Sequence, residues 1–176
     1  MERPEEKTLF LATLVFPVRN TERDRQVMLA TKMKKIGAGC LNGWGGGVEE
    51  GESLLQAAAR EFHEETGATI FSEDLDKIGI VHFKNHKSDG SVFVCTVHVY
   101  TVSKWTGEIR STEEMENPKW YSVADIPLEK LMCADPHWLP RMLNGEKGIA
   151  WAEYEPYQKA LIGEVKFEPM SGFEEE

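Results

Sequence analysis

Apolar and polar positions along the chain alternate in short runs that are typical of strands. The apolar run LFLATLVFPV and the later run QVMLATK are separated by the charged stretch RNTERDR, which predicts two antiparallel strands. Further strands are predicted in ATIFSEDLDKIGIVHF, SVFVCTVHVYTV and PKWYSV, a short helix in DPHWLPRMLNGEKG, and a closing hairpin from IAWAEYEP and KALIGEVKFE. The pattern therefore predicts a large mixed sheet.

One segment, residues 54–65, has the periodicity of an amphipathic helix. At about 100° of rotation per residue, its apolar side chains fall on one arc, which consists of Leu54, Leu55, Ala58, Ala59 and Phe62. Ser53 and Gln56 have the spacing of a capping box, and Gly67 is a typical C-terminal stop. Upstream, six glycines between Gly37 and Gly47 predict a loop whose backbone approaches another group closely.

The last turn of this helix carries three glutamates, Glu61, Glu64 and Glu65. Like charges at this spacing destabilise a helix by roughly 0.2–0.5 kcal/mol per pair, and a helix C-terminus favours cations. A solvated charged face with an Arg60–Glu64 pair is one explanation. The glycine-rich loop favours another, a site for a hard divalent cation such as Mg²⁺, which takes carboxylate, water and phosphate oxygens as ligands. Such a cation would remove the repulsion and attract a polyphosphate.

Length, charge and cysteine content narrow the class of protein. The 176 residues predict a single domain over 1–176, with an acidic tail at 171–176. A net charge of -10 argues against binding to a nucleic acid polymer. The acidic start and the absence of a long apolar run argue against a signal peptide or a membrane partner, so a cytoplasmic protein is expected. Three scattered cysteines, Cys40, Cys95 and Cys133, indicate neither a disulfide framework nor structural zinc.

The stretch GGVEEGESLLQAAAREFHEETGA resembles a known family signature. Its 23 residues, 46–68, match every fixed position of the Nudix box, the motif of hydrolases that cleave nucleoside diphosphates linked to another moiety. The resemblance implies an α/β/α Nudix sandwich with a mixed β-sheet. There is no P-loop G-K-[ST] and no Rossmann fingerprint to support another phosphate-binding fold.

The resemblance also implies roles for residues of the box and its surroundings. Mg²⁺, or in its place Mn²⁺, would be held by Gly45, Gly46, Glu61, Glu64, Glu65 and Glu114. Arg60 would orient the glutamates, Glu52 would brace the loop, and a glutamate (Glu64, Glu65 or Glu114) would act as general base. The metal would activate a water for attack on phosphorus.

Outside the box, residues 8–143 are similar to the animal members of the family that hydrolyse oxidised purine nucleoside triphosphates such as 8-oxo-dGTP. This similarity implies a small-molecule nucleotide substrate, release of pyrophosphate and a role in nucleotide-pool sanitisation. The residues implied in substrate binding are Thr13, Lys32, Asn42, Met132, Asp135 and Trp138. Asn42 could instead hold a turn, Trp138 could be core, and Lys32 could belong to a charged strand edge.

At two positions the chain departs from the residues that these relatives have in the substrate-binding region. Met132 stands where those relatives have a tryptophan, and Ala134 stands where they have a second aspartate. A missing ring and a missing acid could change the base preference. Hydrolysis of a dinucleoside polyphosphate or NADH is therefore an alternative, as is a catalytically silent nucleotide-binding module.

Overall fold

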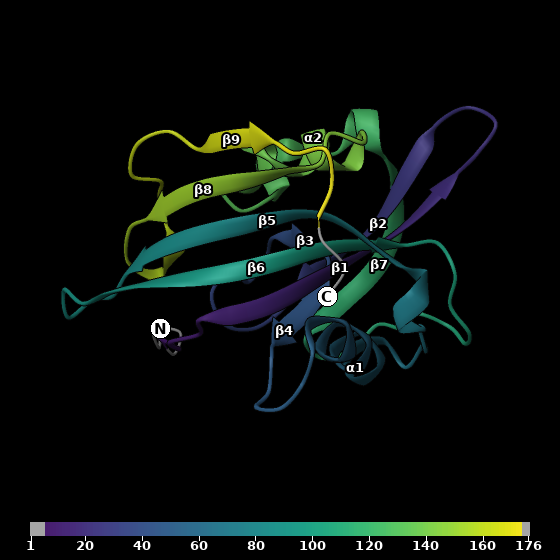
Figure 1. Ribbon diagram of the computed structural model, residues 1–176, viewed down its shortest axis with the longest axis horizontal. Coiled ribbons are helices and arrows are strands. Elements are labelled where there is room, and N and C mark those ends of the chain that lie inside the picture. The colour runs from purple at the N-terminus through teal and green to yellow at the C-terminus, as the bar shows by residue number, and fades with distance from the viewer. Residues whose placement is uncertain (1–5, 174–176) are drawn as a thin grey trace.

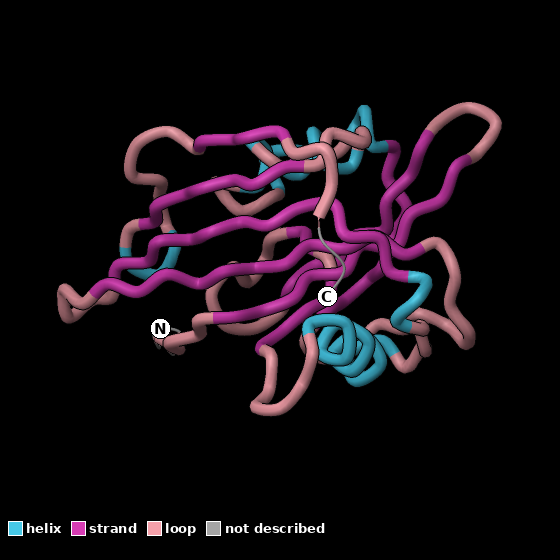
Figure 2. The backbone as a smooth tube through the Cα atoms, viewed as in Figure 1, coloured by secondary structure: helices cyan, strands magenta, loops and turns pink. Residues whose placement is uncertain are grey.

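The computed structural model describes residues 6–173, and within them nine strands form one mixed sheet. The bounds are β1 Leu11–Asn20, β2 Arg25–Lys32, β3 Leu41–Asn42, β4 Trp44–Gly47, β5 Leu75–His86, β6 Val92–Val102, β7 Met115–Ser122, β8 Gly148–Tyr154 and β9 Lys166–Pro169. The two α-helices are α1, Leu54–Thr66, and α2, Leu139–Leu143. Strands dominate the fold, and α1 and α2 lie on different sides of it (Figure 1, Figure 2).

The sheet is organised around β1. The strand order along the sheet is β3-β2-β1-β6-β5-β8-β9, while β4 also pairs with β1 and β7 with β2. The C-terminal end of β1, residues 18–20, pairs antiparallel with β2, and its residues 12–15 pair antiparallel with β4. Strand β6 runs parallel beside β1. Because successive side chains on a strand point to opposite faces, Val15 packs into the core beneath α1 and Phe16 into the core beneath α2. The predicted sandwich with a mixed sheet is confirmed.

Several sequence-based boundaries need correction. The glycine-rich stretch is not only a loop, because β3 and β4 form within it. The strand predicted from Ala68 begins only at Leu75, after a short 3₁₀ turn. The helix ends at Thr66 instead of Glu65, and its buried face is Ala57, Ala58, Phe62 and Thr66. Part of the predicted acidic tail, 174–176, lies outside the described residues.

Helix α1 is terminated as its sequence predicts. The Ser53 hydroxyl accepts a hydrogen bond from the Gln56 N–H at 3.1 Å, and Gln56 Oε1 accepts one from the Ser53 N–H at 2.9 Å. At the other end Gly67 is left-handed, with φ of 81°, and donates to His63 O. Both ends of the helix that carries the glutamates are therefore fixed by local hydrogen bonds.

We expect the substitution Ser53→Ala to lower the free energy of unfolding by about 1 kcal/mol, because it removes the acceptor of the N-terminal cap. Urea unfolding measures this loss. Ser103→Ala is the matched control at an exposed site, where a change within about 0.5 kcal/mol is expected. Equal effects of the two substitutions would show that the capping box does not stabilise α1.

Candidate active site

Arg60 lies at the centre of the hydrogen bonds that join α1 to the segment before it. Its Nε and Nη2 donate to the two carboxylate oxygens of Glu52 at 2.6 and 2.9 Å, and Nη2 also donates to Gly47 O at 3.0 Å. Its Nη1 donates to Glu61 at 2.9 Å and to Glu64 at 3.3 Å. Glu52 in turn accepts from the Glu49 N–H at 3.0 Å. The Arg60 guanidinium holds the pKa of the Glu52 carboxyl below its usual range.

The three glutamates of the helix end face different surroundings. The Glu61 side chain is 17% exposed and the Glu64 side chain is 57% exposed. Burial raises the pKa of Glu65 to about 8, and the neighbouring charges of Glu61 and Glu114 contribute to the rise. Glu61, Glu65 and Glu114 therefore form one acidic group, of which Glu61 is also bonded to Arg60, while Glu64 is the most exposed of the three helix glutamates.

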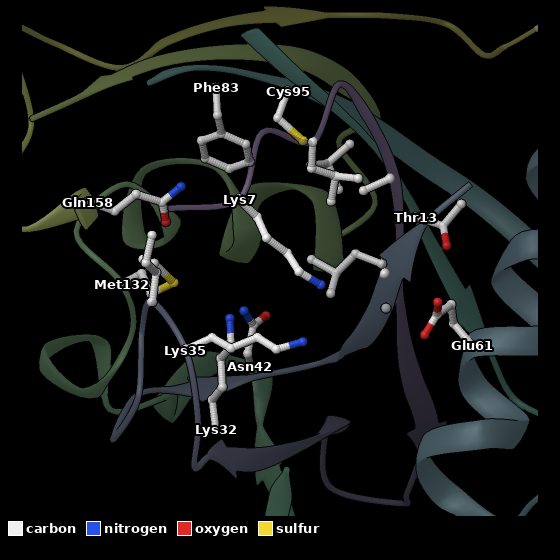
Figure 3. Close-up of a pocket in the computed structure, with 18 of the residues that line it drawn as sticks. Lys7, Thr13, Lys32, Lys35, Asn42, Glu61, Phe83, Cys95, Met132 and Gln158 are labelled. Carbon is white, nitrogen blue, oxygen red and sulfur yellow. The ribbon is translucent and has the colours of Figure 1, made fainter. Parts of the chain in front are cut away.

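The backbone opposite this acidic group has no room for a side chain. A Cβ on Gly46 would lie 2.5 Å from the Glu61 carboxyl carbon, and a Cβ on Gly45 would overlap the Thr13 carbonyl. Thr13 pairs with Gly46 across the sheet, and Figure 3 shows its hydroxyl directed towards Glu61. The Thr13 Oγ1 is buried and has no hydrogen-bond partner among the described residues.

This donor set fits a hard divalent cation. The buried Glu65 carboxyl with its raised pKa, the carboxylates of Glu61 and Glu114 beside it, and the unpartnered Thr13 hydroxyl are groups that such a cation would compensate. Among the described residues, no three His, Cys, Asp or Glu side chains converge on one point as metal ligands would. Mutual repulsion between uncompensated carboxylates gives a physical reason for that spacing.

A cavity of about 1050 Å³ extends from the acidic group across the sheet. Figure 3 shows Glu61 and Thr13 at one end, Met132, Gln158 and Phe83 at the other, and Asn42 between them. Protein sites for small ligands occupy about 300–1,000 Å³. The cavity is therefore large enough for a whole nucleotide.

Lysines line the middle of the cavity. Lys32 ends β2, Lys35 follows it in the β2–β3 connection, and Lys7 reaches in from the segment before β1 (Figure 3). That segment is fixed by Glu6, whose carboxylate accepts hydrogen bonds from the Ser88 N–H at 2.7 Å and the Ser88 hydroxyl at 2.6 Å. Burial lowers the pKa of Lys32, and the charge of Lys35 lowers it further. The cavity thus combines an acidic end with a basic middle.

The remaining predicted substrate residues line the same cavity. Asn42 ends β3, and its Oδ1 accepts a hydrogen bond from the Gly43 N–H at 2.8 Å, which leaves its NH₂ group available. Trp138 is 1% exposed, belongs to the core, and donates from Nε1 to Asp135 Oδ1 at 3.1 Å. Burial raises the pKa of Asp135 to about 7. Met132 contacts the cavity where a ring was expected.

Sequence reasoning missed several residues of this cavity, namely Lys7, Phe83, Asn85 and Gln158. Lys7 precedes the first strand and belongs to no motif. The other three are brought in by β5 and by the β8–β9 connection, which are far apart in the sequence. Their approach depends on the tertiary fold, and no local pattern marks it.

Comparison with known proteins identifies the class. The NUDIX domain family matches residues 8–142, and the chain belongs to the Nudix hydrolases. Enzymes of this family generally use divalent metal ions. No helix within residues 6–173 is long and apolar enough to cross a membrane.

Named relatives and solved structures show which Nudix hydrolases this chain is similar to. The oxidized purine nucleoside triphosphate hydrolase of Danio rerio is 33% identical over 149 residues, which are 85% of this chain and 87% of the relative. The mouse protein of the same name is 34% identical over 123 residues, 70% of this chain and 75% of the relative. The crystal structure of a Bacillus halodurans MutT protein superimposes with a TM-score of 0.72 at 24% identity, covering 92% of this chain and 99% of that one. The chain is thus a Nudix hydrolase related to oxidised purine nucleoside triphosphate hydrolases.

We expect Gly46→Ala to weaken cation binding without unfolding the protein. The new Cβ would displace the Glu61 carboxylate, a side chain that can move. A misplaced charged ligand should lower affinity for Mg²⁺ or Mn²⁺ by on the order of tenfold or more. The thermal stabilisation produced by increasing concentrations of each cation measures this affinity.

Gly45→Ala is the matched control for Gly46→Ala. Its Cβ meets backbone of β1, which cannot move aside, so this variant should instead lose about 1–3 kcal/mol of stability. If Gly46→Ala binds either cation as tightly as the unmodified protein does, Glu61 is not a metal ligand.

Without a divalent cation, stability should fall as pH rises. The folded-state pKa values of Glu65, about 8, and Asp135, about 7, lie above their ordinary values of 4.5 and 3.8. At a pH between the ordinary pKa and the folded-state pKa of each group, the folded state binds more protons than the unfolded state. The free energy of unfolding therefore decreases with increasing pH. The melting temperature in EDTA should therefore fall from about pH 5.5 to about pH 8.5.

The substitution Glu65→Gln tests the origin of this pH dependence. It should flatten the upper part of the curve, whereas Glu73→Gln, at an exposed position, should leave the curve unchanged. An identical slope in the Glu65→Gln variant would contradict the assignment. Added Mg²⁺ should stabilise the protein more at high pH, since the cation competes with the proton for Glu65.

Proposed function

We propose that this Nudix hydrolase cleaves purine nucleoside triphosphates, with oxidised purines such as 8-oxo-dGTP preferred, to a nucleoside monophosphate and pyrophosphate. The observation that carries the proposal is one continuous cavity, which joins the acidic group to Asn42 and Asp135. The names of the zebrafish and mouse relatives support the same substrate class. The biological role would be removal of damaged nucleotides from the precursor pool.

The proposed cofactor is Mg²⁺, with Mn²⁺ as a substitute. Glu61, Glu65 and Glu114, together with a carbonyl of Gly45 or Gly46, are the proposed ligands. The bound cation would neutralise phosphate oxygens and lower the pKa of a water. The ammonium groups of Lys7, Lys32 and Lys35 would face the remaining phosphate charge.

Glu64 is the proposed general base. Its side chain is 57% exposed, so a water can reach it, whereas Glu61 and Glu65 are more buried. Arg60 holds it at 3.3 Å and thereby limits the directions in which it can accept a proton. A carboxylate within reach of the attacking water contributes typically 10²–10⁴-fold to the rate.

Asn42 and Asp135 are the proposed readers of the base. Asn42 keeps its NH₂ group as a donor after Oδ1 has bonded to Gly43. Asp135, with a pKa of about 7, is present at neutral pH both as an acceptor and as a donor. A purine that carries both carbonyl and N–H groups on one edge suits this pair.

A second candidate substrate is a dinucleoside polyphosphate or NADH. Two observations favour it, the volume of about 1050 Å³ and the occurrence of Met132 and Ala134 where a ring and an acid were expected. The reaction product separates the candidates, because these substrates would not release free pyrophosphate.

The test is pyrophosphate release with Mg²⁺ from 8-oxo-dGTP, 2-oxo-dATP, dGTP and dATP, in parallel with NADH and a diadenosine polyphosphate. We expect the oxidised purines to exceed dGTP and dATP in kcat/KM by tenfold or more, about 1.4 kcal/mol of transition-state discrimination. A preference for dinucleotides would establish the second candidate, and no hydrolysis of any compound would indicate a nucleotide-binding module.

Two variants serve as controls for the chemistry. Glu64→Gln should lower kcat by a factor of about 100 or more at an unchanged Mg²⁺ requirement, and Glu65→Gln should also raise the Mg²⁺ concentration needed for half-maximal rate. Unchanged kcat in both variants would refute the assignment of the box glutamates.

A further inference from the structure

The β8–β9 connection contains two consecutive residues in a conformation that L-amino acids rarely adopt. Tyr157 has φ of 61° and Gln158 has φ of 54°, and neither is glycine. Such left-handed residues cost free energy and occur where the surrounding structure fixes them, often at functional sites. Here the turn is closed by the Glu155 N–H, which donates to Ala160 O at 2.9 Å. Both left-handed residues line the cavity.

The orientation of the Gln158 amide follows from a chain of hydrogen bonds. The Phe83 carbonyl can only accept, so Asn85 must direct its NH₂ group to it, at 3.0 Å. Asn85 Oδ1 then faces Gln158 and accepts from its Nε2 at 2.9 Å. Asn85 is 6% exposed, so both of its hydrogen bonds lie inside the fold. The Gln158 Oε1 is left as the acceptor, and no donor among residues 6–173 is bonded to it.

Gln158 lies at the end of the cavity that is remote from the acidic group. Figure 3 shows its side chain beside Met132 and near Phe83, while Glu61 lies at the opposite end. A nucleotide whose phosphates face the acidic group would extend its base towards this remote end. Gln158 is therefore placed to contact the base.

A fixed acceptor distinguishes oxidised from normal purines. In guanine and adenine N7 is itself an acceptor, whereas oxidation at C8 places a hydrogen on N7 and makes it a donor. An amide oxygen attracts the donor and repels the lone pair. We propose that Gln158 is a specificity-determining residue, whose Oε1 accepts a hydrogen bond from the N7–H of a purine oxidised at C8, with Asn85 as its positioning residue.

This inference rests on the proposed function and would supply a selectivity that Ala134, in the position of an expected acid, does not provide. The contact would be made to a group that only the oxidised base carries. Its removal should therefore affect one substrate and spare the other. A merely structural role of Gln158 would affect both substrates equally.

The experiment compares kcat and KM for 8-oxo-dGTP and dGTP in the full chain and in Gln158→Met, which keeps the length of the side chain and removes its polar atoms. We expect kcat/KM for 8-oxo-dGTP to fall tenfold or more, chiefly through KM, while kcat/KM for dGTP is not lowered, because the repulsion of its N7 lone pair is removed as well. Lys159→Met, in the same connection but outside the cavity lining, is the matched control and should change neither. Melting temperatures of the variants verify folding.

Asn85→Ala and the double variant test the positioning role. Asn85→Ala should lower selectivity, and the double variant Asn85→Ala with Gln158→Met should discriminate no worse than Gln158→Met alone. Additive losses would overturn the role of Asn85. An unchanged ratio of the two substrates in Gln158→Met, or an equal fall for both, would overturn the inference.

The unmodified protein separates this result from a failure of the proposed function. If it does not prefer 8-oxo-dGTP over dGTP, the proposed function fails and the inference fails with it. If it does prefer 8-oxo-dGTP and Gln158→Met retains the preference, only the inference fails.

Discussion

The bidentate pair between Arg60 and Glu52 is the interaction on which the arrangement of the site depends. It joins the helix that carries the glutamates to the segment that leaves β4, and the same guanidinium also contacts Gly47 O, Glu61 and Glu64. One cation thus compensates several carboxylates that would otherwise repel one another. Because the planar guanidinium donates in fixed directions, it also sets where those carboxylates point. A lysine could supply the charge but not the geometry.

Arg60 does not neutralise the whole acidic group of Glu61, Glu65 and Glu114, and among the described residues part of that group's negative charge remains without a partner cation. Glu65 lies away from the guanidinium, and its pKa of about 8 reflects burial beside Glu61 and Glu114. Natural proteins retain an unfavourable group of this kind where a ligand compensates it. The protein would thus give up some stability at neutral pH in exchange for affinity towards a divalent cation. Under the proposed function, the lysines in the middle of the cavity would extend the attraction to a polyphosphate, despite a net charge of -10.

The parts of the fold that follow from short-range rules were predictable, and those that depend on distant contacts were not. The capping box of Ser53, the stop at Gly67 and the partial exposure of the glutamates follow from local spacing. In contrast, β4 forms from glycines that have low strand propensity, because Glu61 and the Thr13 carbonyl leave no space for a Cβ. The left-handed Tyr157 could not be anticipated, since tyrosine has no preference for that region. The bond between Asn85 and Gln158 joins residues 73 positions apart.

The two ends of the cavity therefore differ in how they are built, and so do the proposed catalytic residues and the proposed base-binding residues. Most of the acidic end of the cavity comes from one continuous segment, in which strand, turn and helix hold Glu61 and Glu64 by local bonds, while Glu114 is brought in from the segment before β7. The remote end is assembled from β5, the β8–β9 connection and the segment around Met132, each of which can change without disturbing Arg60. A different residue at a position such as Met132 can therefore alter the surface that a base would meet while the box stays intact. A polar group that is missing from one of these segments can be supplied by another, as the acceptor on Gln158 illustrates.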